Sequence, residues 1–81
     1  MEKQVIIYST PTCHFCHMAK DYFNQNKIEF TELDVATDLE ARQDMMNRSG
    51  QMGVPQILIG DDLVIGFDKP RIDILLGLSG K

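Results

Sequence analysis

Residues 5–16 read VIIYSTPTCHFC, and this stretch decides the fold of the chain. Its first half is a continuous run of apolar β-formers, which is typical of a strand covered on both faces. Its second half begins a helical pattern that contains Cys13 and Cys16, the only two cysteines among the 81 residues. A Cys-x-x-Cys pair at a strand-to-helix junction is the arrangement that thiol–disulfide exchange requires.

The two cysteines are expected to differ in their chemistry. Cys13 stands where a helix begins, and the unpaired N–H groups and positive dipole end stabilise a thiolate there. Cys16 lies one turn along, points inward and keeps a higher pKa, which suits a thiol that resolves a mixed disulfide. The pattern therefore predicts a dithiol oxidoreductase; the alternative is two reduced cysteines that only pack. His14, as an imidazolium, would stabilise the Cys13 thiolate, unless it is an exposed residue without an electrostatic role.

Length and charge limit the range of functions. Eighty-one residues suffice for a single domain, 1–81, with an ordinary apolar fraction of 43%. The net charge is −4 and no lysine or arginine cluster occurs, which argues against nucleic-acid and anionic-membrane partners. No apolar run is long enough to cross a membrane, and Met1–Gln4 shows no secretory signal. We therefore expect a cytoplasmic protein, in which a cysteine pair is catalytic rather than a persistent bridge.

The apolar periodicity predicts seven elements in the order β-α-β-α-β-β-α. They are strands at 4–9, 29–34, 56–59 and 63–65, and helices at 13–26, at 37–48 and from 68 onward. The first three form a right-handed βαβ unit, and the whole predicts an α/β fold with a four-stranded sheet and helices on both faces. The side chains expected in or near the core are Phe15, Met18, Ala19, Tyr22, Phe23, Ala41, Met45, Met46, Met52, Ile72, Leu75 and Leu76.

Local signals mark the helix ends. Thr37 and Glu40 fit a capping box at the start of the second helix, and Gly50 is expected to end it. Asp68 can cap the last helix, with Pro70 tolerated in its first turn.

Residues 13–17 also spell Cys-x-x-Cys-His, the c-type haem attachment pattern. Haem would need His17 as one axial ligand and a methionine such as Met52 as the other. The strand patterns around the first helix and the lack of an export signal argue against haem, and His17 is then expected to be a solvated helix residue. Zinc is disfavoured as well, because all four Cys and His residues lie within five positions and only a dimer could complete the site.

Two further stretches carry information. In residues 53–56, which read GVPQ, Pro55 cannot donate to a ladder, so it belongs at the start of a strand. Residues 66–68, which read GFD, end a hairpin and open a helix, where backbone N–H groups favour an anion and a glycine allows close approach. An ordinary turn followed by a helix cap explains these three residues equally well.

Together, residues 5–9, 12–16, 53–55 and 66–68 strongly resemble the glutaredoxins. The match is to the small bacterial glutaredoxin-like proteins, which include the ribonucleotide-reductase redoxin type. It covers essentially the whole chain, with the motifs in the right order and at the right separations. The resemblance implies a thioredoxin fold with a mixed four-stranded sheet.

The resemblance also implies the tasks of the site residues. Cys13 attacks and Cys16 resolves, while the backbone of Val54 holds the substrate and the Val54–Pro55 peptide bond is cis. The corner at 66–68 receives the γ-glutamyl end of glutathione in true glutaredoxins. No metal and no tightly bound cofactor are implied, and glutathione enters as a co-substrate. The expected substrate groove comprises Thr12, His14, Phe15, Val54, Pro55, Gly66, Phe67 and Asp68.

Three positions depart from the common pattern of that family. His14 and Phe15 stand where the usual pair has proline and tyrosine, and Thr10 stands where many glutathione-using members have a lysine. Arg42 is a candidate for the compensating charge. The electron donor is therefore either glutathione or a flavoprotein thioredoxin reductase, and the substrates are disulfide-bearing proteins. We expect a monomer. The alternatives to the oxidoreductase function are a non-catalytic module, for instance a dimer that bridges an iron–sulfur cluster through Cys13 and bound glutathione, and a redox sensor.

Overall fold

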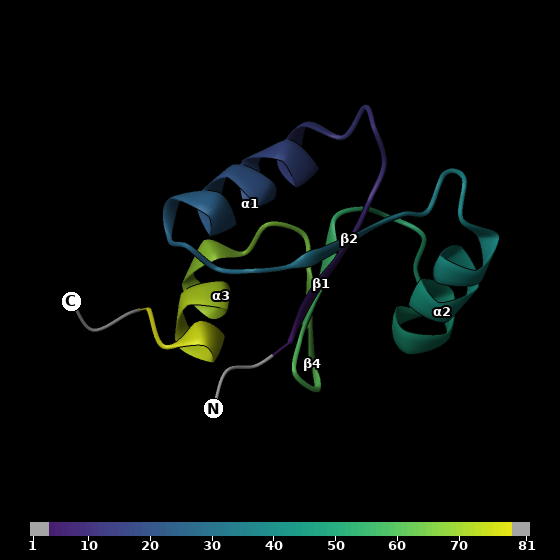
Figure 1. The fold of residues 1–81 in the computed structure, drawn as a ribbon. Helices are drawn as coiled ribbons and strands as arrows, with labels where there is room; N and C mark the ends of the chain where they lie inside the picture. The colour runs from purple at the N-terminus through teal and green to yellow at the C-terminus, as the bar shows by residue number, and fades with distance from the viewer. Residues whose placement is uncertain (1–3, 79–81) are drawn as a thin grey trace.

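The computed structural model describes residues 4–78. Residues 1–3 and 79–81 lie outside the described residues, so the lack of a secretory signal at the N-terminus stays a prediction. Seven elements follow one another in the predicted order (Figure 1). They are β1 (Val5–Ser9), α1 (His14–Gln25), β2 (Thr31–Asp34), α2 (Leu39–Ser49), β3 (Gln56–Ile59), β4 (Asp62–Ile65) and α3 (Lys69–Leu76). β2 begins two residues later than predicted, because its pairing with β1 starts where Thr31 lies opposite Ile6.

The four strands form one mixed sheet in the order β2-β1-β3-β4. β1 runs parallel to β2 and antiparallel to β3, and β4 is antiparallel to β3. Tyr8 of β1 lies opposite Gln56 of β3, which lies opposite Ile65 of β4. This register places the end of β1, the start of β3 and the end of β4 at one end of the sheet.

Helices cover both faces of this sheet, which is the predicted thioredoxin fold (Figure 1). Successive residues of β3 point to opposite faces, so Ile57 and Ile59 pack with α1 and α3 while Leu58 packs with α2. The α1 and α3 side holds Val5, Ile7, Ala19, Phe23, Ile57, Ile59, Val64 and Ile72. The α2 side holds Tyr8, Val35, Ala41, Met45 and Leu58. Burial on both faces explains why β1 and β3 read as apolar runs.

The core prediction is wrong at three positions. Phe15 is 56% exposed, Met18 is 39% exposed and Met52 is 56% exposed. Phe15 and Met18 each precede a residue of the inward stripe of α1, and one position rotates a helical side chain by about 100°. That stripe consists of Cys16, Ala19 and Phe23. Four other predicted core residues are only partly buried: Tyr22, Met46, Leu75 and Leu76.

The start of α2 corrects the predicted capping box. Asp38, and not Thr37, is the N-cap residue, and its Oδ1 accepts the Ala41 N–H at 3.1 Å. Thr37 instead donates its N–H to the Asp34 carbonyl at 3.2 Å, so it belongs to the turn that follows β2. Aspartate and threonine both suit an N-cap, and the turn decides which of the two neighbours takes that position.

The other predicted helix ends are confirmed. Gly50 ends α2 in the left-handed region, with a φ of 72°. Asp68 caps α3 by accepting the Arg71 N–H at 3.3 Å, and Pro70 stands in the first turn. None of the helices within residues 4–78 has the length and apolar character that a membrane crossing would need.

Candidate active site

Cys13 and Cys16 lie at the start of α1 and are paired as a disulfide, with their Cα atoms 5.2 Å apart. Cys13 is the N-cap residue, with an extended backbone, and its Sγ accepts the Cys16 backbone N–H at 3.1 Å. Cys16 is fully buried, whereas Cys13 is partly exposed. A reacting sulfur can therefore approach Cys13 and not Cys16, which is the geometry that the predicted roles require.

The helix N-terminus favours a negative charge on Cys13. Its sulfur occupies the capping position that a serine, threonine or aspartate oxygen usually fills. The nearby N–H groups and the helix dipole both stabilise a thiolate there. The first turn of α1 contains no acidic residue, so no carboxylate in that turn opposes this charge.

The loop between β1 and α1 is held at two points. The Cys13 N–H donates to the Thr10 carbonyl at 3.3 Å. His17 Nε2 lies 3.1 Å from the Pro11 carbonyl oxygen, to which it donates because a carbonyl can only accept. His17 is exposed, as predicted, yet it is bonded to the loop rather than only solvated. The sequence pattern gave no signal for this contact.

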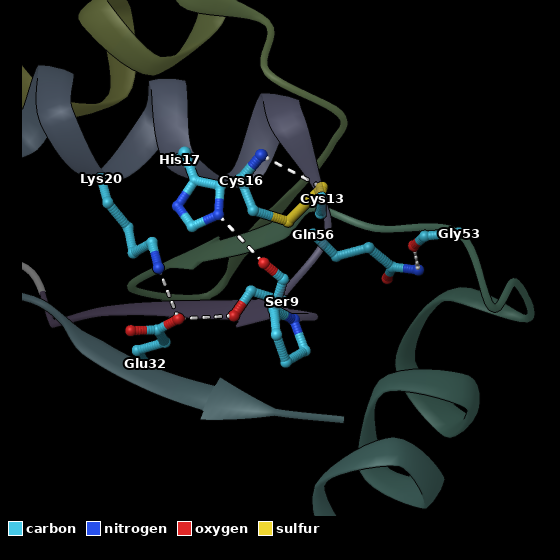
Figure 2. The surroundings of a disulfide bond; sticks show 9 residues. Ser9, Cys13, Cys16, His17, Lys20, Glu32, Gly53 and Gln56 are labelled. Carbon is cyan, nitrogen blue, oxygen red and sulfur yellow. Dashed lines mark hydrogen bonds and ion pairs between the residues drawn. A yellow bond between two sulfur atoms is a disulfide. The ribbon is translucent and has the colours of Figure 1, made fainter. Parts of the chain in front are cut away.

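A charged cluster beside the disulfide joins α1 to the sheet (Figure 2). Glu32 Oε2 accepts hydrogen bonds from Lys20 Nζ at 2.7 Å and from Ser9 Oγ at 2.8 Å. These two bonds, followed by the electrostatic effects of Lys20 and of the His17 ring, hold the pKa of Glu32 below its usual range. Ser9 is the buried last residue of β1, so the cluster ties β1, β2 and α1 together. The sequence analysis did not predict this cluster; the one usable signal was Ser9, a polar residue at the end of an apolar strand.

The Val54–Pro55 peptide bond is cis, as the resemblance implied. Pro55 is buried and Val54 is partly exposed. Gln56 is fully buried, and its Nε2 donates to the Gly53 carbonyl at 2.9 Å (Figure 2). The same Nε2 donates to the Gln51 carbonyl at 3.1 Å. This side chain therefore holds the loop that carries Val54. The sequence analysis did not single it out, although a polar residue in the buried strand QILI is a usable signal.

The corner at 66–68 adjoins the cis-proline. The Gly66 N–H donates to the Pro55 carbonyl at 2.8 Å. Gly66 has a φ of 83°, which residues with a side chain rarely adopt, and the space beside its Cα is open. The Phe67 ring packs edge-on against Tyr22, with 5.8 Å between the ring centroids. Gly66 thus borders an open surface, whereas Phe67 packs against the core.

The sheet register brings the predicted stretches to one place. Because the end of β1, the start of β3 and the end of β4 share one end of the sheet, the loops at 10–13, 53–55 and 66–68 meet there. Thr12, His14 and Phe15 are exposed at this end. Within residues 4–78, no three His, Cys, Asp or Glu side chains cluster in a way that suits a metal ion.

Comparison with known sequences assigns the family. The sequence model of the Glutaredoxin family matches residues 5–64. The chain belongs to the glutaredoxin family. It is 43% identical over 70 residues to an uncharacterized glutaredoxin-like 8.6 kDa protein in the rubredoxin operon of Clostridium pasteurianum, covering 86% of this chain and 93% of that protein. It is 38% identical over 64 residues to glutaredoxin 3 of Escherichia coli strain K12, covering 79% of this chain and 77% of the relative.

One solved structure has the same fold. The crystal structure of a glutaredoxin from Archaeoglobus fulgidus superimposes with a TM-score of 0.81. The match covers 96% of this chain and 88% of that one, and at 19% identity it shows the fold alone. Membership of the glutaredoxin family and the paired cysteines together support a thiol–disulfide redox role for this glutaredoxin-family protein.

Proposed function

We propose that this protein is a cytoplasmic dithiol oxidoreductase that reduces disulfides within proteins or mixed disulfides with glutathione. The observation that carries the proposal is the position of the Cys13 sulfur, which is partly exposed and accepts the Cys16 N–H at the start of α1. A sulfur at that position is stabilised as the thiolate, which is the attacking species. Cys16 lies buried behind it, where it can attack only the sulfur of Cys13.

The reaction consists of two thiol–disulfide exchanges. The Cys13 thiolate attacks one sulfur of a disulfide R–S–S–R′ and forms a Cys13–S–S–R bond, and R′–S⁻ leaves and takes up a proton from solvent. Cys16 then loses its proton, and its thiolate attacks Cys13 Sγ, which releases R–S⁻ and leaves the Cys13–Cys16 disulfide. The substrate gains two electrons and the protein loses two, so each cycle needs a two-electron donor.

The end of the sheet that carries Cys13 and Val54 is the proposed place for the substrate chain. Val54 precedes the cis-proline, and its N–H and C=O have no backbone partner within residues 4–78. An extended substrate segment can bond to these two groups as an added strand would. Thr12, His14 and Phe15 are exposed and lie next to Cys13 or one position further along the chain, so they are proposed to contact the rest of the substrate.

Two electron donors are proposed for this site, and neither requires a tightly bound cofactor. Glutathione would place its γ-glutamyl end at the open corner beside Gly66, with Arg42 of α2 as the candidate cation in place of the missing lysine. A flavoprotein thioredoxin reductase would instead deliver electrons directly to the Cys13–Cys16 disulfide. Two assays coupled to NADPH separate these donors, one through glutathione and its reductase and the other through thioredoxin reductase.

The serine variants of the two cysteines test the proposal. Cys13→Ser should abolish turnover in both assays, because a hydroxyl is not ionised at neutral pH and does not attack a disulfide. Cys16→Ser should keep the first attack and lose the second, so mixed disulfides with protein substrates should accumulate after acid quenching. Non-reducing electrophoresis and mass spectrometry detect them, and the variant that lacks both cysteines controls for non-specific capture. Substantial turnover by Cys13→Ser would contradict the proposal, as would a wild-type protein that is inactive with both donors.

A further inference from the structure

We propose that His17 is a positioning residue, which holds the loop in front of Cys13 through the Pro11 carbonyl and so keeps the Cys13 sulfur at the helix N-terminus. The inference rests on the proposed function of Cys13 as the nucleophile. It gives a task to the histidine of the Cys-x-x-Cys-His pattern that neither haem attachment nor simple solvation describes.

The geometry that carries this proposal is a short bridge across the helix start. His17 lies one turn after Cys13, and its backbone N–H donates to the Cys13 carbonyl at 3.2 Å. Its ring reaches back past the cysteine to the Pro11 carbonyl, six residues earlier, at 3.1 Å. The backbone bond from Cys13 to Thr10 is the other hydrogen bond that the structure gives to residues 10–12 within the described part of the chain. The ring therefore fixes the exposed middle of a loop that has few other constraints.

The position of this loop matters for the chemistry of Cys13. An N-cap residue keeps its side chain on the free N–H groups only while its own backbone stays extended, as Cys13 is with φ −84° and ψ 113°. Movement of the loop at Pro11 would change that backbone and weaken the bond from the Cys16 N–H to Cys13 Sγ. The thiolate would then lose part of its stabilisation, and the pKa of the Cys13 thiol would rise.

Tethering and charge are separable contributions of the same ring. Nε2 carries a hydrogen in the imidazolium and in one neutral tautomer, so the bond to Pro11 does not require a positive charge. A charged pair lies beside the ring, Lys20 on the same helix and Glu32 on β2, and the two are bonded to each other (Figure 2). A contribution from the ring charge would disappear in any neutral replacement, whereas a tether would survive in a neutral side chain that reaches Pro11.

The experiment compares His17→Gln with His17→Asn, two neutral amides that differ by one methylene. The longer Gln can bring its N–H groups to the Pro11 carbonyl, and the shorter Asn cannot. The measurement is the pH dependence of Cys13 alkylation by iodoacetamide in the reduced full-length protein, read by mass spectrometry. We expect the pKa of Cys13 to rise by about half a unit to one unit in His17→Asn and His17→Ala, the worth of one hydrogen bond, and to stay at the wild-type value in His17→Gln.

Two controls make the result specific. Asn24→Ala changes an exposed side chain two turns further along α1 and should leave the Cys13 pKa unchanged. Hydrogen exchange of the Cys13 amide, measured on the oxidised protein, should be faster in His17→Asn and His17→Ala than in His17→Gln. Because His17 is exposed, all three variants are expected to fold, and circular dichroism verifies it.

Two other outcomes would contradict the positioning role of the His17–Pro11 hydrogen bond. Unchanged pKa values in all three variants would show that the loop holds its position without the ring. An equal rise in His17→Gln and His17→Asn would assign the effect to the ring charge instead. Alkylation needs no disulfide substrate, so a wild-type protein without reductase activity would refute the proposed function and still leave the positioning role measurable.

Discussion

Gln56 fixes the geometry of the site without taking part in the chemistry. Its amide is fully buried at the start of β3, and its Nε2 donates to two loop carbonyls, those of Gln51 and Gly53. Its Oε1 has no hydrogen-bond partner among the described residues. A side chain that faces two acceptors must donate, and an amide supplies two N–H donors from one nitrogen. This amide therefore holds the loop that leads to Val54, together with Ser49, whose Oγ accepts the Gln51 N–H and donates to the Gln51 carbonyl.

Gln56→Glu should destabilise the protein in a pH-dependent way. A buried carboxyl facing two carbonyl oxygens favours its neutral form, so its pKa in the folded state lies above the unfolded value of about 4.3. The deficit is therefore small below the unfolded pKa and grows as the pH rises through the folded pKa. At pH 7 we expect a loss of about 3 kcal/mol in the free energy of unfolding. Urea unfolding at several pH values measures it.

The matched control for that variant is Gln51→Glu, which places the same charge on an exposed side chain of the same loop. It should change the free energy of unfolding by less than about 0.5 kcal/mol. Equal losses for the two glutamate variants at neutral pH would show that the Gln56 amide does not hold the loop.

The three helices begin with the same capping hydrogen bond, but the acceptor atom in α1 differs from that in α2 and α3. Each N-cap side chain accepts the backbone N–H three residues later, and the N-cap residues are Cys13, Asp38 and Asp68. In α2 and α3 the acceptor is a carboxylate oxygen, which suits the positive end of a helix. In α1 the acceptor is sulfur, a weak one, so this helix start is less firmly capped and carries a reactive group instead.

The start of α2 offers a direct test of the capping correction. Asp38→Ala should lower the free energy of unfolding by about 1 kcal/mol, because the Ala41 N–H loses its acceptor. Thr37→Ala should change it by less than about 0.5 kcal/mol, since the Thr37 contribution to the turn is its backbone N–H. Chemical denaturation of the two variants gives both values. A larger loss of stability for Thr37→Ala than for Asp38→Ala would show that Thr37, and not Asp38, caps α2.

Side-chain bonds between residues distant in sequence join the layers of the whole molecule. The Tyr8 hydroxyl donates to Asp44 at 2.5 Å and connects β1 with α2. The Tyr22 hydroxyl donates to Asp73 and connects α1 with α3. With the bonds to Glu32 on the other side of α1, these contacts tie both neighbours of the active-site loop, β1 and α1, to the rest of the fold.

Asp44 should make part of the stability depend on pH. The Tyr8 hydroxyl and then Arg48 hold the pKa of Asp44 below its ordinary value of 3.8. A lowered folded pKa means that the contribution is present above the unfolded pKa and is lost as the pH falls through the folded pKa. Asp44→Asn should therefore cost about 1 kcal/mol at neutral pH, a modest figure because the carboxylate is 46% exposed, and progressively less in acid.

Thermal or urea unfolding of the wild type and Asp44→Asn between neutral and acidic pH measures this difference. Asp21→Asn removes a carboxylate from the exposed face of α1 and should show no comparable convergence on acidification. A difference for Asp44→Asn that stays constant down to acidic pH would show that the charge on Asp44 does not contribute to stability.

Local patterns in the sequence determined the order of the elements and the place of the cysteine pair. These signals depend only on residues that are close in sequence, so they can be recognised without the structure. They are the apolar run of β1, the helical spacing after Cys13 and the helix-end signals at Gly50 and Asp68. The prediction of a cis bond before Pro55 rested on the family resemblance, because the local sequence alone favours a trans X-Pro bond.

The tertiary structure alone decided the features that depend on distant partners. Ser9 and Glu32 are 23 positions apart and meet only because β1 and β2 pair in parallel. The contact of His17 with Pro11 follows from the path of the loop. Apolar periodicity predicts which helix residues could face the core, but the packing of the sheet against the helix determines which of them are buried. Phe15 fits the periodicity and is nevertheless exposed. Spacing along a chain determines local hydrogen bonding, but burial and long-range pairing are properties of the packed molecule.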